Sequence, residues 1–243
     1  MGQSHERQSE ECTMKPLESP RFQELLVLLK SFPLDAEHVL PSLSKIIEHQ
    51  AERNLGRVFG DLANGGKPLE SHFHHAMDKV TQTRAFGDVV YPYFPPETEN
   101  FIFHEREKGS KNVIAVAKGE QRVHAEYDLL LAFYEPAVEG IVIGIIESKK
   151  AGSSSDNTGT SAAKRIFKPI EELMEKYPHI KGYAFGVITA LPCSEGLQEQ
   201  VARVGGNVCS MGIQSVQYDA YAREVKKGIR EKYDQLHTRR RAG

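Results

Sequence analysis

Apolar residues recur at intervals of three and four along the first third of the chain, the spacing of one face of a helix. This pattern predicts helices over residues 20–31, 35–63 and 68–83. Asn64-Gly65-Gly66 is typical of the end of the second helix. Residues 1–19 are polar and have no such period, so we expect a disordered tail there.

The middle of the chain changes to short runs of β-branched and aromatic residues, separated by turn-forming residues. Strands are predicted over 89–94, 101–104, 112–117, 122–134 and 140–149. The last third then predicts, in chain order, a helix over 161–177, a strand over 182–191, a helix over 194–204, a strand over 212–218 and a helix over 220–237.

This order of elements indicates one α/β domain in which helices flank a central mixed sheet. We expect four segments along the chain: the tail 1–19, an N-terminal helical segment 20–66, a core 67–219 and a basic C-terminal helix 220–243.

Charged residues interrupt two of the apolar strands and predict a polar cluster. If the turn between these strands is centred between Ala137 and Val138, opposed residues have numbers that add up to 275. Asp128 then opposes Glu147, and Glu126 opposes Lys149, all on one face. Such a cluster is costly to bury unless its members pair or bind a metal, and a buried ion-pair network without catalysis is the alternative.

A pair of carboxylates with a lysine suits phosphodiester hydrolysis. Magnesium binds through one or two carboxylates and keeps several waters. The metal activates a water and polarises the phosphate, while the lysine stabilises the charge that develops.

Asp128, followed by a hairpin and Glu147-Ser148-Lys149, resembles the PD-(D/E)xK nuclease signature, whose family includes type II restriction endonucleases. The resemblance covers roughly residues 67–191 and implies a restriction-endonuclease-like core. It implies that Asp128 and Glu147 are metal ligands, with the Ser148 carbonyl as a further ligand, and that Lys149 is the catalytic lysine. Tyr127 stands where the signature has proline.

Many members of that family carry another acid on the helix before the sheet. Glu70 and Glu52 are the two candidates here. We prefer Glu70, because its helix directly precedes the strands.

The charge pattern bears on the substrate. The net charge is −2, but eight basic and three acidic residues lie between Ala220 and Gly243. We expect Arg239, Arg240 and Arg241, together with Lys164, Arg165 and Lys168, to contact nucleic-acid phosphates. A solvated, frayed terminus and a solvated helix face are the alternatives.

Other features of the sequence narrow the class of protein. The longest apolar run, Ile141–Ile146, is too short for a membrane span, and no secretory signal is visible. The three widely spaced cysteines predict reduced thiols in the cytoplasm.

Together these patterns predict a magnesium-dependent endonuclease of the restriction type that cleaves double-stranded DNA. Manganese can substitute for magnesium. A homodimer is expected by resemblance, since cutting both strands usually needs two sites. A catalytically silent nucleic-acid-binding or assembly module with the same fold is the alternative.

Overall fold

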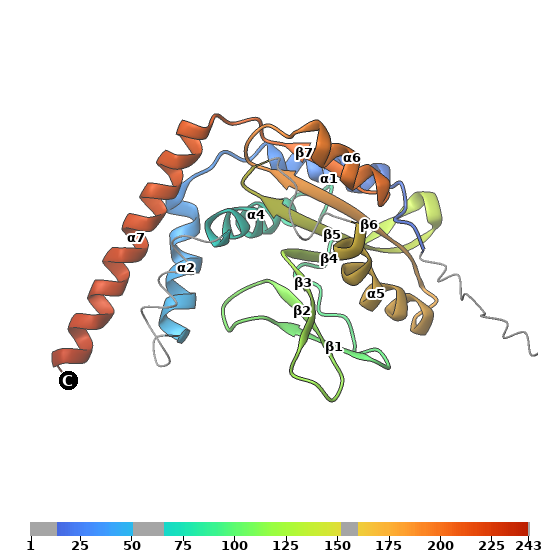
Figure 1. Cartoon of the computed structure of the whole chain (residues 1–243), viewed down its shortest axis with the longest axis horizontal. Helices are drawn as coiled ribbons and strands as arrows, with labels where there is room; N and C mark the ends of the chain where they lie inside the picture. Colours follow the sequence, from blue (N-terminus) through green and yellow to red (C-terminus); the bar gives the residue numbers. More distant parts are fainter. Residues whose placement is uncertain (1–13, 51–65, 152–159, 243) are drawn as a thin grey trace, which may run out of the picture.

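The described chain is a mixed α/β structure built on two sheets (Figure 1). The computed structural model describes residues 14–50, 66–151 and 160–242. A three-stranded antiparallel sheet has the order β1-β2-β3, and a four-stranded mixed sheet has the order β4-β5-β6-β7. The strands are β1 (Phe101–Glu105), β2 (Val113–Ala117), β3 (Val123–Tyr127), β4 (Leu129–Glu135), β5 (Gly140–Lys149), β6 (Ile180–Thr189) and β7 (Asn207–Ser210).

Helices cover both faces of the four-stranded sheet. They are α1 (Pro20–Lys30), α2 (Ala36–Gln50), α4 (Lys67–Val80), α5 (Thr160–Lys176), α6 (Glu195–Arg203) and α7 (Ser215–Ala242). Apolar residues of α1, α2, α4 and α7 form one core with one face of the sheet. Residues of α5, α6 and the three-stranded sheet form a second core on the other face. No helix within the described ranges has the length and hydropathy that a membrane crossing needs.

The β4–β5 hairpin has the register that the sequence predicts. Seven residue pairs, from Leu129 with Ile146 to Glu135 with Gly140, have numbers that add up to 275. The Glu135 side chain accepts a hydrogen bond from the Ala137 amide and caps the short 3-10 turn over Pro136–Val138. Glu139 closes the turn in the left-handed region, with a φ of 48°.

The remaining strands of this sheet follow the usual βαβ connections. Helix α5 joins β5 to β6, and α6 joins β6 to β7, and both strand pairs are parallel. The carboxyl ends of these strands therefore meet at one edge, where Lys149 pairs with Thr189 and Thr189 with Ser210. Because β5 is buried on both faces, it is almost entirely apolar until Glu147.

Two of the predicted strands do not form. Residues 89–94 form only an isolated bridge, between Val90 and Ala132. Residues 212–218 are not a strand: the last strand is the four-residue β7, and α7 already begins at Ser215. A strand this short carries too little alternation to be recognised from its pattern.

The prediction of a disordered tail over residues 1–19 is wrong for residues 14–19. These residues pack on the fold, because the Leu17 amide donates to the Tyr183 carbonyl and Ser19 is buried. Residues 1–13 lie outside the described part. Residues 51–63 of the predicted second helix, including Glu52, also lie outside the described part. Residues 36–50 of that helix are helical as predicted.

Candidate functional site

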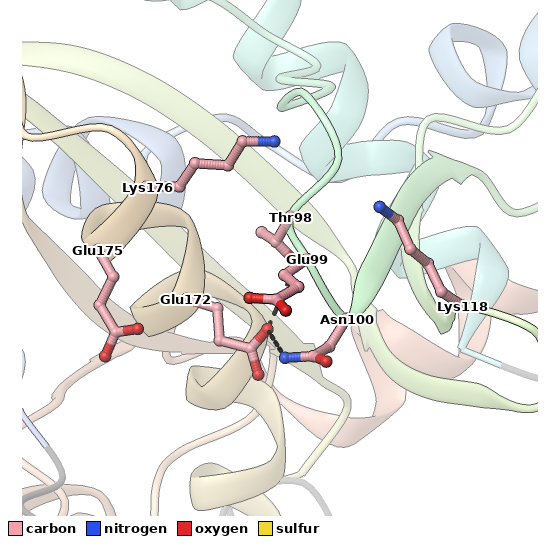
Figure 2. Close-up of a pocket in the computed structure, with 7 residues that line it drawn as sticks. All are labelled: Thr98, Glu99, Asn100, Lys118, Glu172, Glu175 and Lys176. Atoms are coloured by element: carbon pink, nitrogen blue, oxygen red, sulfur yellow. Dashed lines mark hydrogen bonds between the residues drawn. The ribbon is translucent and has the colours of Figure 1, made fainter.

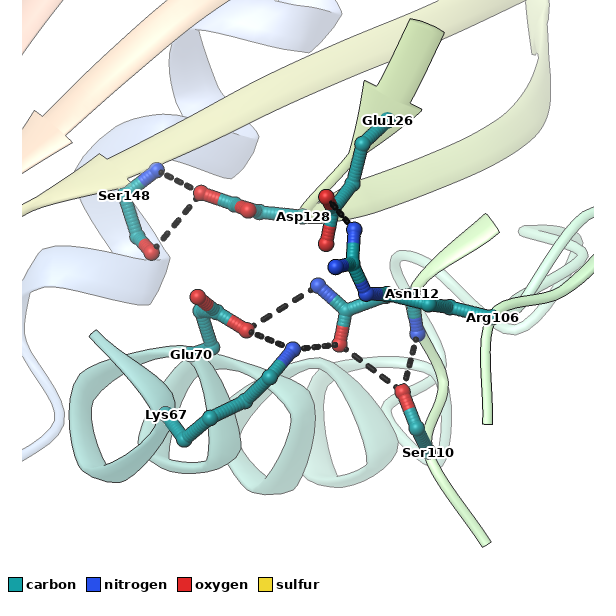
Figure 3. Close-up of polar contacts among 8 residues, drawn as sticks. All are labelled: Lys67, Glu70, Arg106, Ser110, Asn112, Glu126, Asp128 and Ser148. Atoms are coloured by element: carbon teal, nitrogen blue, oxygen red, sulfur yellow. Dashed lines mark hydrogen bonds and ion pairs between the residues drawn. The ribbon is translucent and has the colours of Figure 1, made fainter. Parts of the chain in front are cut away.

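Asp128 lies at a break between the two sheets. The single strand predicted over 122–134 is two strands, because β3 pairs with β2 in one sheet and β4 pairs with β5 in the other. Asp128 Oδ2 accepts hydrogen bonds from the amide of Ser148, at 2.8 Å, and from its hydroxyl, at 3.1 Å (Figure 3). These bonds fix the carboxylate against the carboxyl end of β5.

Glu147 and Lys149 lie on β5, next to that break. The Glu147 side chain is fully buried, and its Oε2 lies 3.2 Å from Lys149 Nζ. Its other oxygen, Oε1, is buried and has no hydrogen-bond partner among the described residues. A buried carboxylate oxygen without a donor is a costly arrangement, so it indicates a position where a ligand can bind.

The electrostatics of these residues reflect crowding of negative charge. Burial, followed by the charge of Glu70, raises the pKa of Asp128 to about 6. Burial, followed by the charge of Asp128, raises the pKa of Glu147 to about 8. Burial alone would lower the pKa of Lys149, but Glu147 and Asp128 raise it above its ordinary value. Lys149 therefore stays charged, whereas it is unfavourable for both carboxyls to be ionised at the same time.

Glu70 approaches the same site from α4 (Figure 3). Its Oε2 accepts hydrogen bonds from Lys67 Nζ at 2.7 Å and from Asn112 Nδ2 at 3.0 Å. Lys67 also reaches Asn112 Oδ1 at 3.2 Å, so the three side chains form one network. Because Glu70 raises the pKa of both Asp128 and Glu147, it belongs to the same electrostatic cluster.

Glu126 does not join the cluster as expected. It lies on β3, opposite Ile114, and forms an ion pair with Arg106 (Figure 3). The expected pairing of Glu126 with Lys149 fails because the chain leaves the four-stranded sheet at Asp128, so the register of the hairpin does not extend to β3.

Asp128 and Glu147 suit a hard divalent cation that needs only one or two carboxylate ligands. Within the described ranges, no three His, Cys, Asp or Glu side chains converge to hold a metal. Magnesium needs only one or two carboxylates, because water completes its coordination. Asp128 and the unpartnered oxygen of Glu147 provide two, and a cation between them would relieve their repulsion.

The basic residues that we expected to contact phosphates belong to α5 and to the end of α7. Lys164, Arg165 and Lys168 are exposed on α5, and the last two lower the pKa of His124 on β3, after the effect of burial. The backbone of residues 239–241 continues α7, while the side chains of Arg239, Arg240 and Arg241 lie outside the described part.

Three residues at the site were not predicted from the sequence. Lys67 lies three positions before Glu70, one residue ahead of the predicted start of that helix, and the spacing could have revealed the pair. Asn112 is 42 residues away from Glu70, and no sequence signal links them. His74 hydrogen-bonds the main chain of Asp128, and burial lowers its pKa to about 3, so the ring is neutral.

A separate pocket of about 540 Å³ lies between the carboxyl half of α5 and the start of β1 (Figure 2). Three glutamates and two lysines line it. Glu172 faces Asn100 across the pocket and accepts its amide hydrogen at 2.9 Å. This contact ties α5 to the three-stranded sheet, and the excess of acid disfavours a phosphate ligand.

Comparison with known proteins gives little similarity. No protein-family model and no curated protein matches the sequence. Among solved structures, the chain is similar to the protein VC1899 from Vibrio cholerae, at 13% identity and a TM-score of 0.33. The matched region covers 89% of this chain and 58% of that protein.

Proposed function

We propose that this chain is a magnesium-dependent endonuclease that hydrolyses phosphodiester bonds in DNA, with a restriction-endonuclease-like core. One observation carries the proposal: Asp128 and Glu147 are two buried carboxyls whose pKa values are raised, in part by nearby negative charge, next to a charged lysine. Perturbed carboxyls of this kind concentrate at catalytic sites.

The residues would divide the chemistry between them. Asp128 and Glu147 would hold the cation, and the Ser148 amide and hydroxyl keep Asp128 in place. Bound Mg²⁺ would supply Lewis-acid activation of the phosphate and of a water. Lys149 places its ammonium beside Glu147, where it can stabilise negative charge that builds on the phosphate.

Glu70 has a supporting role in this proposal. Lys67 and Asn112 already hold its Oε2, so their hydrogen bonds fix the carboxylate beside the metal ligands. Its charge favours binding of a cation and disfavours approach of the phosphate without one.

Cleavage of supercoiled plasmid and of mixed-sequence linear DNA tests the proposal. The wild type should cleave with Mg²⁺ or Mn²⁺ and stop when EDTA is added. Asp128→Asn and Glu147→Gln conserve shape but remove the anionic ligand, so each should lose cleavage by about a hundredfold or more. Glu199→Gln, on the exposed face of α6, is the matched control and should cleave like the wild type.

The outcomes separate two functions. If Asp128→Asn cleaves as fast as the wild type, the assignment of the site is wrong. If the wild type cleaves neither DNA nor RNA with any divalent metal, the chain is a silent module of the kind that the sequence leaves open.

A further inference from the structure

A groove lies between the start of α4, the end of β5 and the first half of α7. Its volume is about 600 Å³. Ser148 near the end of β5 and Lys150 just after that strand form one wall, and Arg223 and Lys226 of α7 form another. We call it the α7 groove.

The charge of the α7 groove differs from that of the protein as a whole. Among the described residues, three basic side chains, Lys150, Arg223 and Lys226, and one acid, Asp219, line it, whereas the whole chain has a net charge of −2. Lys150 pairs with Asp219 at 3.1 Å and lies 4.9 Å above the ring of Tyr218. Because bases outnumber acids in this set, the described side chains that line the groove carry a net positive charge.

The groove adjoins the candidate site. Ser148 forms part of its wall, and the amide and hydroxyl of the same residue hold Asp128. Leu69, next to Glu70, also lines it. Ser148 and Lys150 alternate with Glu147 and Lys149 along the chain, so the groove lies on the other face of β5 and borders the site at Asp128 and Glu70.

We propose that the α7 groove binds the phosphate backbone of the nucleic acid on one side of the bond that is cleaved. This inference rests on the proposed function, and it goes beyond it by assigning the contact to Arg223 and Lys226 of α7. Neither residue belongs to the basic sets on α5 and at residues 239–241 that the sequence indicates. Phosphate contacts position a nucleic acid without reading its sequence. The groove would therefore orient the nucleic acid and would not determine which sequence is recognised.

The occupant follows from the chemistry of the walls. Cationic side chains beside a carboxylate cluster favour a polyanion that brings one phosphate to the metal ligands and the next ones to the groove. The acidic pocket of Figure 2 has the opposite charge, so the same argument does not favour a phosphate ligand there.

The test measures binding separately from cleavage. Fluorescence anisotropy with a labelled mixed-sequence duplex, with Ca²⁺ in place of Mg²⁺ and over a series of salt concentrations, gives both the affinity and its salt dependence. Arg223→Glu/Lys226→Glu should weaken binding by at least about tenfold at low salt, and it should reduce the slope of log K against log salt by about 1.8.

The matched control changes the same charge elsewhere. Lys15 and Lys181 are exposed and lie toward the opposite end of β6 from the site, because the Leu17 amide bonds to Tyr183 and Lys181 is near the start of that strand. Lys15→Glu/Lys181→Glu should lower affinity only slightly, through net charge, and should keep the wild-type slope.

Three results decide the matter. A weakening confined to the groove variant supports the proposal. Equal affinities and slopes in the two double variants overturn the groove while leaving the nuclease intact, provided that the wild type binds and cleaves. A wild type that binds no duplex overturns the proposed function and the groove together.

Discussion

Burial opposes the ionisation of the Glu147 and Asp128 carboxyls, and the charge of Glu70 adds to this effect on Asp128, as the charge of Asp128 does on Glu147. Their folded-state pKa values lie above the ordinary values, at about 8 and about 6. A carboxyl with a raised folded pKa stabilises the fold at pH values below its ordinary pKa, and that contribution is lost as pH rises through the folded value. The metal-free protein should therefore become less stable between roughly pH 4.5 and pH 8.

Glu147→Gln tests this dependence, because the amide keeps the shape and cannot ionise. The variant should be more stable than the wild type at pH 8 by a few kcal/mol, and the two should converge near pH 4. Urea denaturation in EDTA at a series of pH values gives the difference. Glu199→Gln is the exposed control, and a wild type that gains stability with pH relative to Glu147→Gln would contradict the raised pKa of Glu147.

Lys149 should matter for turnover more than for binding. In Lys149→Ala both metal ligands remain, so metal and DNA should still bind, whereas cleavage should fall by about 10² or more. Lys149→Arg should recover only part of the rate, since guanidinium is planar and bulkier. Single-turnover cleavage at saturating magnesium gives the rates, and Lys181→Ala, at the far end of β6, is the control. A rate for Lys149→Ala equal to the wild type would remove the lysine from the mechanism.

Much of the site's geometry could be predicted from the sequence. The turn before Gly140 sets the hairpin register, which ends with Leu129 opposite Ile146 and so brings Asp128 beside the end of β5. Asn112 could not be predicted, because its contact with Glu70 depends on how α4 packs beside β2. No local pattern encodes such a contact.

At the scale of elements, α1 is held at its start by one buried serine. Pro20 opens the helix, and the Ser19 hydroxyl accepts from the Phe22 amide at 3.0 Å while it donates to Glu135. The residue therefore caps α1 and satisfies a buried carboxylate of β4.

Ser19→Ala should remove both interactions. We expect a decrease of about 2–4 kcal/mol in the free energy of unfolding, because the helix loses its cap and a buried acceptor is left without its donor. Ser31→Ala, at the exposed end of the same helix, is the control and should cost less than about 0.5 kcal/mol. Urea denaturation compares them, and equal decreases would show that neither interaction of Ser19 stabilises the fold.

The sequence predicts most elements but not where a strand changes sheets. Apolar residues flank Asp128 on both sides, and this aspartate is the only residue over 122–134 of a type common in turns, so the pattern does not mark a break. The chain divides there because β3 pairs with β2 and β4 with β5, and that competition is decided by tertiary packing. The start of α7 was missed for a similar reason, since residues 215–218 include Val216 and Tyr218, which are typical of strands.

At the scale of the whole molecule, the basic C-terminal region should steer an otherwise acidic protein toward nucleic acid. Removal of residues 239–243 deletes three arginines. Duplex binding should weaken at low salt, and the slope of log K against log salt should flatten by about 0.9 for each phosphate that these arginines neutralise. Anisotropy titrations of the truncated and full chains measure this, and an unchanged slope would leave the region as a solvated end.

The break at Asp128 makes a single residue the direct covalent link between the two sheets. Asp128 joins β3 to β4, whereas Glu147 belongs to β5 in the four-stranded sheet. Under the proposed function, a cation held by both carboxyls would clamp this link to that sheet. By reciprocity, any displacement of the three-stranded sheet that moves Asp128 would weaken cation binding by the same free energy with which the cation resists the displacement. Metal affinity would then report the alignment of the two sheets, and local opening of β1–β3 would release the cation before the fold itself is lost.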